Sequence, residues 1–347
     1  MKKILGLLVV ILMVISLTGC SSSSDEEKSE VSSDVTTYKI GICNYVDDAS
    51  LNQIVENIKN TLEAENEKGE VYFEVSDKNC NADAAVLDQI ISGFVADGVD
   101  LMIGVATPVA ISMQAATEDN EIPVVFAAVS DPVGAGLVES NEKPGANITG
   151  TSDYLDTSAV LNLALSLNPE LTKVGLLYDQ GQDSSTTAIK EAKAFLDEKG
   201  IEYKEYTGTN TNEISLAVDS MAADGIKVAF TPSDNTVMTA ELTIYEKMAE
   251  NNIQHFAGAD SFALNGAFVG YGVDYANLGV ETGKMVIDIL ENGKDISTYS
   301  VKTFDNGIAT VNTEICASLG MDYAFVSDSF TPYCTAVKEI TTSEDFN

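Results

Sequence analysis

Polar residues that could bind a small molecule recur directly after the apolar runs of this 347-residue chain. If these runs are strands of parallel sheets, their carboxyl ends share one edge, and such sheets bind ligands at that edge. The residues at these ends therefore form one candidate set. Its members are Asn44, Tyr45, Thr107, Pro108, Ser130, Asp131, Tyr178, Ser233, Asp234, Asn235, Thr236 and Asp260.

These side chains suit binding through hydrogen bonds and single charges. We expect Thr107 to cap a helix whose first position is Pro108, so that free N–H groups and the helix dipole attract an anion. Asp234 adds an acid where a serine is already present to cap the following helix. Taken singly, each residue is also explained as a helix cap, and Asp131 and Asp153 as ordinary turn residues. The binding interpretation depends on the whole set.

Signatures of catalysis are scarce. The one histidine, His255, stands beside an apolar residue, which indicates a structural role and disfavours Ser-His-Asp or Cys-His chemistry. Neither G-x-S-x-G, H-E-x-x-H nor a P-loop occurs. Two G-x-G sequences occur, but the third glycine of a dinucleotide-binding G-x-G-x-x-G motif is replaced by Glu139 in one and by Tyr275 in the other. We expect no catalytic residue, no cofactor and no metal, although sequence alone does not exclude a carboxylate pair for glycoside hydrolysis.

The charge of the chain restricts its partners. It carries 54 acids against 19 bases, a formal net charge of −35, so nucleic acid is not an expected partner. All 19 bases are lysine, and the chain has no arginine. A bound carboxylate or phosphate therefore cannot be held by a guanidinium fork, and we expect helix N-termini, backbone N–H groups and hydroxyls to take its place.

The N-terminus has the pattern of a targeting segment. Lys2 and Lys3 precede an apolar run over 4–17, which is too short to span a membrane and ends in Leu-Thr-Gly-Cys20. This ending resembles a bacterial lipobox, which implies that 1–19 is a signal peptide and that Cys20 is lipidated. Residues 20–36 are polar and predict a disordered tether. The domain is then expected outside the cell at the membrane. The alternative is an ordinary signal peptide with a chance cysteine.

The rest of the chain alternates strand and helix patterns in two series. Apolar strands separated by amphipathic helices predict parallel sheets covered on both faces. The first series has strands at 38–43, 71–75, 101–106 and 122–129, and the second at 173–179, 201–206, 226–230 and 253–259. Ala-Asp-Gly, an apolar run and Thr-Pro occur once in each series, over 96–108 and 223–232. We therefore expect two similar doubly wound α/β lobes.

Four cysteines remain after the lipobox. None has metal or redox spacing, and an extracellular location permits disulfides. Cys43 lies in an apolar strand and is expected to be a buried thiol. Cys316 and Cys334 are close enough in sequence to be a candidate pair, which the sequence leaves open.

Several stretches together resemble one family, the ABC-transporter substrate-binding lipoproteins of the tryptophan/tyrosine type. The most specific are "VSDPVGAGLV" and "PSDNTV"; "KPGANITGTSD" and "GYGVDYANLGVETGKM" support them. The resemblance covers 38–315 and implies a class I periplasmic-binding-protein fold with a three-crossing hinge near Gly150, Asp274 and Ile296. The N-terminal lobe would comprise 37–150 and 274–297, and the C-terminal lobe 151–273 and 298–347. Residues 316–347 do not align.

The resemblance also implies a function, the binding of a small molecule for an ABC permease and its ATPase. Members of the family bind amino acids, often aromatic ones. The ligand's carboxylate would lie at Thr107 with help from Ser130, and its ammonium at Asp234 or Asp260. Candidates for an aromatic wall are Tyr45, Tyr154, Tyr178 and Tyr271. The alternatives are a sensory lipoprotein of the same fold and an extracellular enzyme.

Overall fold

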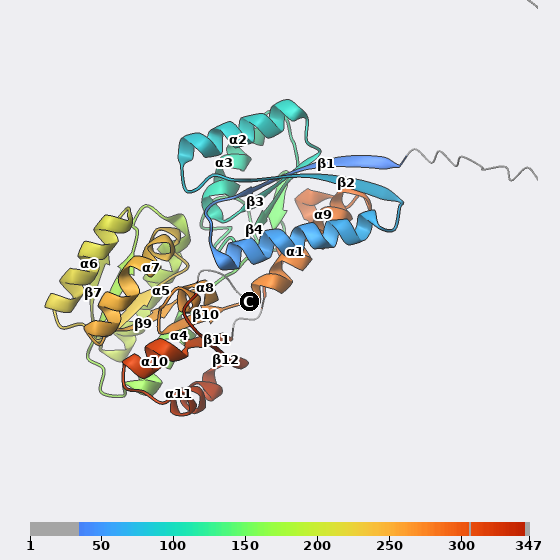
Figure 1. Ribbon diagram of the computed structural model, residues 1–347. Helices are drawn as coiled ribbons and strands as arrows, with labels where there is room; N and C mark the ends of the chain where they lie inside the picture. The colour runs from blue at the N-terminus through green and yellow to red at the C-terminus, as the bar shows by residue number, and fades with distance from the viewer. Residues whose placement is uncertain (1–34, 305–306, 344–347) are drawn as a thin grey trace, which may run out of the picture. The chain divides into compact units, whose positions relative to one another are not determined.

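The computed structural model describes residues 35–304 and 307–343, which contain two sheets (Figure 1). The first sheet has five strands, all parallel, in the order β2-β1-β3-β4-β5. It forms the first lobe together with α1–α3. The elements are β1 (Thr36–Asn44), α1 (Ala49–Asn66), β2 (Val71–Asn79), α2 (Ala84–Asp97), β3 (Leu101–Val105), α3 (Thr107–Thr117), β4 (Val124–Ala127) and β5 (Ile148–Gly150).

The second sheet has seven strands in the order β12-β11-β10-β9-β8-β6-β7. Its strands β7-β6-β8-β9-β10 are parallel and repeat the 2-1-3-4-5 order of the first lobe. The elements of this second lobe up to the last parallel strand are α4 (Thr157–Leu167), β6 (Lys173–Tyr178), α5 (Asp183–Lys199), β7 (Glu202–Thr207), α6 (Thr211–Ala223), β8 (Val228–Thr231), α7 (Asn235–Glu250), β9 (Gln254–Ala257), α8 (Asp260–Leu264) and β10 (Val269–Gly272). The expectation of an α/β fold with two parallel sheets is confirmed.

Burial explains why the central strands read as continuous apolar runs. All residues of β3, β4 and β8 are buried, as expected for strands that helices cover on both faces. The helices bury one face each; α1, for example, buries Leu51, Ile54, Ile58 and Leu62. The strand ends that carry polar residues are therefore held by well-packed elements.

The repeated Ala-Asp-Gly frame builds equivalent parts of the two lobes, β3 and β8. Gly98 ends α2 with φ +63°, and Gly225 follows α6 with φ +71°, a left-handed conformation that favours glycine. The Thr-Pro pairs differ from each other. Thr107 and Pro108 are the first residues of α3, whereas α7 begins three residues after Pro232, with Asp234 as its N-cap. The second Thr-Pro therefore does not open a helix.

Helix α9 (Tyr275–Leu290) follows β10 but packs against α1 and β4 of the first lobe (Figure 1). Two glycines allow the close approach to α1. A β-carbon at Gly279 would lie 2.5 Å from the carbonyl oxygen of Ile54, and one at Gly283 would lie 2.8 Å from Cβ of Thr61.

The third crossing between the lobes differs from expectation. After the 3₁₀ turn η1 (Ile296–Thr298), the chain runs beside β5, where Tyr299 O accepts a 2.6 Å hydrogen bond from Thr149 Oγ1. Lys302 pairs with Thr151 and donates its backbone N–H to Gly150 O at 2.9 Å. The chain therefore leaves the first lobe after Lys302, and not near Ile296.

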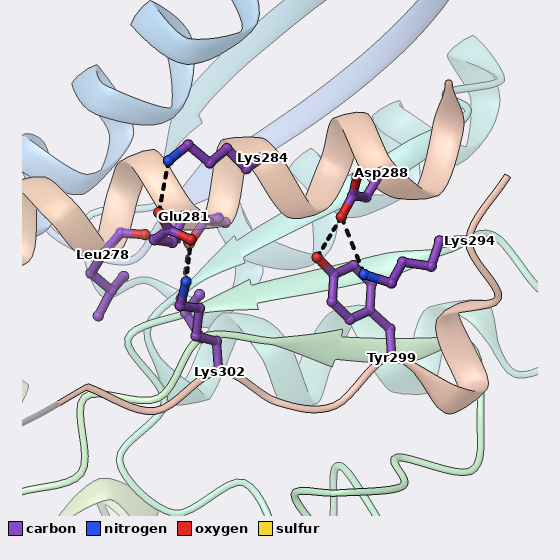
Figure 2. A network of polar contacts seen from close by, with 9 residues as sticks. Leu278, Glu281, Lys284, Asp288, Lys294, Tyr299 and Lys302 are labelled. Carbon is purple, nitrogen blue, oxygen red and sulfur yellow. Dashed lines mark hydrogen bonds and ion pairs between the residues drawn. The ribbon is translucent and has the colours of Figure 1, made fainter. Parts of the chain in front are cut away.

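The crossing segments are anchored to α9. Figure 2 shows Lys302 paired with Glu281, and Glu281 is also paired with Lys284 at 2.8 Å. Asp288 of the same helix accepts a 2.8 Å hydrogen bond from the Tyr299 hydroxyl. On the buried side, the hydroxyl oxygens of Thr151 and Thr282 lie 2.8 Å apart.

The C-terminal segment is more regular than the sequence indicated. It contains β11 (Ile308–Asn312), α10 (Thr313–Ser318), α11 (Tyr323–Phe330), the 3₁₀ turn η2 (Thr331–Tyr333) and β12 (Ala336–Ile340). β11 is antiparallel to β10, and β12 pairs in parallel with β11, so the segment extends the second sheet.

The cysteines and the N-terminus complete the comparison with the sequence. Cys43, Cys80, Cys316 and Cys334 are all free thiols, so the candidate Cys316–Cys334 pair is not formed here, and Cys43 is fully buried. The expected signal peptide and Cys20 lie outside the described residues, as does the tether up to residue 34; β1 already begins at Thr36. No helix in the described part of the chain is long and apolar enough to cross a membrane.

Replacement of Gly279 by alanine is expected to destabilise the protein by about 1–3 kcal/mol, because the added methyl group overlaps the α1 backbone. Gly93→Ala is the matched control. Gly93 lies within α2 with nothing within 4 Å of an added β-carbon, so alanine there should stabilise by roughly 0.5–1 kcal/mol. Urea unfolding of both variants measures the difference. Equal stability of the two variants would contradict the close packing of α1 on α9.

Candidate ligand-binding site

A cavity lies at the carboxyl ends of both sheets, at the points where the strand order reverses. These points are the gaps between β1 and β3 and between β6 and β8. The free volume between its walls is about 20 Å³, so the walls lie close together in this structure. We call it the cleft cavity. Its lining residues are Ser50, Leu51, Ala106, Thr107, Ala128, Ser130, Asp153, Ser184, Ser233, Asn235, Met238, Ala259 and Tyr275.

A second cavity, with a free volume of about 10 Å³, adjoins the first and shares Ser130, Ser184 and Ser233 with it. We call it the side cavity. Its other lining residues are Asp131, Tyr154, Leu155, Thr187, Ala188 and Glu191. Among the residues that the structure describes, no lysine or histidine lines either cavity.

The N-terminus of α3 is open toward the cleft cavity. The N-cap is Ala106 and not Thr107 as expected, and no side chain caps the helix. The N–H groups of the first turn are therefore available for an anion. Thr107 is the first helical residue, 2% exposed, and its Oγ1 has no hydrogen-bond partner among the described residues. An unpartnered buried hydroxyl is costly, so its place on this wall indicates a ligand partner.

The N-terminus of α5 supplies the same features from the second lobe. Its N-cap is Gln182, and again no side chain caps the helix. Ser184 is buried in the first turn, and its Oγ has no partner among the described residues. Since α3 and α5 contact each other, two uncapped helix N-termini meet at the cavity. The sequence reasoning missed Ser184, although its position shortly after β6 was a usable signal.

Two of the non-glycine residues with positive φ lie on the same wall. Ala106 has φ +78° and ψ 155°, and Ala128 has φ +54°. A residue other than glycine in such a conformation costs on the order of 1–3 kcal/mol. Both alanines line the cleft cavity, which is where strained backbone is expected when it serves to position binding groups.

Asp153 gives the cleft cavity its charge. It is 7% exposed, and its Oδ1 accepts a 3.1 Å hydrogen bond from Ser130 Oγ. Burial raises the pKa of Asp153 to about 6. No lysine or histidine of the described chain is within ion-pair distance of Asp153. Since a buried carboxylate needs a counter-charge, this position favours a cationic group on the ligand.

Asp234 cannot take the role expected of it, because its oxygens are already used. Oδ1 accepts from the backbone N–H groups of Thr236 and Val237, at 3.0 and 2.9 Å. Oδ2 accepts from Asp179 N at 2.8 Å and from Ser185 Oγ at 2.6 Å. Asp234 is fully buried and does not line the cleft cavity. It ties α7 and α5 to β6 and is not an ammonium site.

Asp260 lies beside the cleft cavity, not among its lining residues. Its Oδ1 accepts a 2.6 Å hydrogen bond from Ser50 Oγ, and Ser261 N donates to the same Oγ at 3.2 Å. Burial raises the pKa of Asp260, and Ser50 and Lys338 counter that shift. The contact joins the start of α1 to the start of α8 and therefore crosses between the lobes.

Asp131 and Thr187 make another contact between the lobes. Thr187 Oγ1 donates to Asp131 Oδ2 at 2.6 Å, and both residues line the side cavity. Together with the Ser50–Asp260 contact, this bond holds the lobes against each other around the ligand cavities.

The remaining predicted residues are distributed around these cavities. Ser130, Ser233 and Asn235 line the cleft cavity. Asn44 and Thr236 are held by hydrogen bonds to nearby side chains: Asn44 donates to Asn52 at 3.0 Å, and Thr236 donates to Asp179 at 2.7 Å. Pro108 is the second residue of α3. Tyr45 is half-buried, with its pKa raised by burial.

Two tyrosines expected in the aromatic wall lie elsewhere. Tyr271 is 2% exposed and packs in the core of the second lobe. Tyr178 donates its hydroxyl to Glu205 at the outer side of β6. Tyr154 lines the side cavity and donates to Glu191 at 3.2 Å. The tyrosine on the cleft cavity is Tyr275, which the sequence reasoning did not select.

Other residues missed from the sequence lie in the first turn after a strand or inside a helix. Ser50 and Leu51 open α1, and Ala259 precedes α8. The rule of reading strand ends would have found them if it had included the following helical turn. The same extended rule would have found Tyr275, the first residue of α9 after β10, whereas Met238, further into α7, carried no such signal.

His255 is buried in a polar network away from both cavities. Its Nδ1 lies 3.0 Å from Glu241 Oε1, and its Nε2 lies 2.8 Å from Thr231 Oγ1. All three residues are at most 1% exposed. The network fixes the end of β8 behind the cleft and offers no accessible nucleophile.

Comparison with known proteins agrees with this geometry. The family model described as ABC transporter substrate binding protein matches residues 39–327. A tyrosine-binding protein of Clostridioides difficile (strain R20291) is 32% identical over 324 residues, which are 92% of this chain and 93% of that protein.

Two solved structures are similar over most of the chain. An ABC domain from Streptococcus pneumonia in complex with L-Trp has a TM-score of 0.79 at 30% identity, covering 87% of this chain and 100% of that one. A ligand-free, open substrate-binding protein with adhesive properties from Clostridium difficile has a TM-score of 0.66 at 30% identity, covering 88% and 100%.

Acidification from about pH 7 to about pH 5 is expected to stabilise the ligand-free protein. Burial is the largest cause that raises the pKa of Asp48, Asp153 and Asp234 to about 6 each, from 3.8. The folded state then binds protons more tightly than the unfolded state, so stability is lost as the pH rises through about 6. Urea unfolding at the two pH values measures the change.

Asp153→Asn is the control for this prediction, because it removes one of the three buried carboxyls. The variant should gain less stability on acidification than the wild type. A wild type that becomes less stable over the same pH interval would contradict the assignment of raised pKa values.

Proposed function

Because the chain belongs to the ABC transporter substrate binding protein family, we propose that it binds an amino acid in the cleft cavity and delivers it to the permease of an ABC importer. The observation that carries the proposal is the chemistry of the cavity walls. Two helix N-termini without a side-chain cap stand on one part of the wall, and the buried carboxylate of Asp153 stands on another. In the described part of the chain no base lines the cavity. This arrangement is complementary to a zwitterion.

The ligand's carboxylate lies at the junction of α3 and α5. Thr107 Oγ1 and Ser184 Oγ are free to donate to it, and the helix dipoles add roughly 0.3–1 kcal/mol each, up to about 2 when partly buried. This replaces the guanidinium that the chain does not possess. The ammonium group lies at Asp153, which is the acid that lines the cavity. The ammonium site is thus assigned to Asp153 in place of Asp234.

The side chain of the ligand lies against the apolar part of the wall. Leu51, Met238, Ala259 and Tyr275 form this part. Similar proteins are described as tyrosine-binding or as a complex with L-Trp. We therefore assign an aromatic amino acid to this chain.

Ligand binding is coupled to closure of the lobes. Asp153 lies just after the first crossing, α3 belongs to the first lobe and α5 to the second, so a zwitterion contacts all three at once. A ligand that binds the closed state better than the open state shifts the population toward closure. The closed form is then what the permease receives.

Asp153→Asn is expected to weaken binding of L-tyrosine or L-tryptophan by at least about tenfold, because it removes the counter-charge of the ammonium group. The wild type should be stabilised by about 2.7 kcal/mol at a hundredfold excess of ligand over its Kd. Thermal-shift screening of amino acids, sugars, nucleosides and peptides, followed by calorimetry, measures both. Asp83→Asn, at the exposed cap of α2, is the control.

Two results would contradict this proposal. If only sugars or nucleosides shift the melting temperature, the amino-acid assignment fails. If Asp153→Asn binds as tightly as wild type, the ammonium site is elsewhere.

The proposal includes a lipid anchor at Cys20, supported by the lipobox pattern before it. Cys20→Ser should abolish incorporation of labelled palmitate and release the protein from membranes into the medium. Ser21→Ala, at the next residue, is the control and should leave both unchanged. Fractionation of cells that express each variant checks the outcome, and a Cys20→Ser variant that stays membrane-bound would contradict the anchor.

A further inference from the structure

Ser50 stands at the apolar part of the cleft cavity and is 1% exposed. Leu51 follows it in sequence, and Ala259 precedes its partner Asp260. Met238 is also close, since its sulfur lies 3.5 Å from the hydroxyl of Ser261, whose backbone N–H donates to Ser50. Ser50 is therefore, with the hydroxyl of Tyr275, a polar group near the expected position of the ligand's side chain.

The hydroxyl proton of Ser50 is already committed. Ser50 Oγ donates to Asp260 Oδ1 at 2.6 Å, and a carboxylate can only accept. One lone pair of the same oxygen accepts from Ser261 N at 3.2 Å. No other hydrogen bond to Ser50 Oγ is made by the described residues. The hydrogen-bonding capacity that remains on this cavity-lining oxygen is its second lone pair, which is an acceptor.

Two other cavity hydroxyls differ from Ser50 in this respect, whereas those of Ser130 and Ser233 donate to Asp153 Oδ1 and Gly258 O. Thr107 Oγ1 and Ser184 Oγ have no partner in the described chain and are free to donate. Donors therefore stand where the carboxylate binds, and an obligatory acceptor stands beside Leu51, Met238 and Ala259. The cavity distinguishes not only charge but also the direction of hydrogen bonds.

We infer that Ser50, held as an acceptor by Asp260, is a specificity-determining residue that selects an aromatic amino acid with a hydrogen-bond donor on its side chain. A phenol O–H or an indole N–H fills the free lone pair of Ser50. A phenyl ring leaves that lone pair buried and unpaired, and sites built to pair a polar group discriminate strongly against ligands that lack it. This inference rests on the proposed function and narrows its ligand class.

The test compares ligands that differ only in the donor. Dissociation constants are measured by calorimetry for L-tyrosine against L-phenylalanine and for L-tryptophan against 1-methyl-L-tryptophan. Of the two parent ligands, the one that wild type binds more tightly is expected to lose about 10²-fold in affinity when its donor is removed. In Ser50→Ala the same loss should shrink to below about threefold, because no acceptor is left to satisfy.

Asp260→Asn tests the positioning role. An asparagine amide can donate to Ser50 Oγ, which frees the serine proton and removes the obligatory acceptor. The ratio of affinities within a pair should fall at least about tenfold. Because the ratio compares two ligands on one protein, a variant that is merely less stable or less well closed does not change it.

Thr187→Val is the matched control at the other contact between the lobes. It removes the bond to Asp131, which lies in the side cavity. All four ligands should bind more weakly by a common factor, and the ratios should remain those of wild type. If Ser50→Ala does not fold, the affinity ratios of Asp260→Asn and Thr187→Val are compared instead, and only those of Asp260→Asn should fall.

Two results would overturn the inference. One is a wild type that binds each donor-free analogue within about threefold of its parent, and the other is a full ratio retained in Ser50→Ala. In both cases amino-acid binding, and with it the proposed function, still stands. If none of the four ligands binds and no other amino acid shifts the melting temperature, the proposed function itself fails.

Discussion

The reversal of strand order in two parallel sheets is the constraint on which the rest of the molecule depends. In each lobe the second strand lies on one side of the first, and the third and later strands lie on its other side. The connections that follow the first and third strands therefore leave the carboxyl edge of the sheet in opposite directions. The gap that results cannot be filled by the connections themselves. In the first lobe it lies between the starts of α1 and α3, and in the second between the starts of α5 and α7. Four helix N-termini consequently face one cavity.

These four termini are not equivalent, and the difference gives the cavity its polarity. Asp48 and Asp234 cap α1 and α7 with their own carboxylates, so those helices offer nothing to an anion. The starts of α3 and α5 lack such a cap. In a chain without arginine, leaving two helices uncapped is a way to attract a carboxylate. The strained alanines at Ala106 and Ala128 show that the backbone accepts a cost to keep this wall in place.

The sequence was sufficient to predict the two parallel sheets and the edge at which the site lies. The repeated Ala-Asp-Gly frames, the continuous apolar runs and the polar residues after them all depend on local patterns. The residues of the site were harder to predict, because a shift of two or three residues in the start of a helix changes which residue caps it. Thr107 was expected to be a cap and is instead an unpartnered hydroxyl, whereas Asp234 was expected to be unpartnered and is a saturated cap. Tyr271 and Tyr275 are four residues apart, and only the fold decides which of them faces the ligand.

The anchoring of the crossing segments to α9 has a consequence for how occupancy is signalled. Thr282 holds the first crossing, Glu281 holds the third, and glycine contacts fix the helix to α1. We expect the closely packed α1 and α9 to move together when the lobes open or close, so that their outer surface changes little. A partner that binds this surface alone recognises the protein but does not detect whether the cleft holds a ligand. Only a partner whose contact surface spans both lobes can detect whether a ligand is bound.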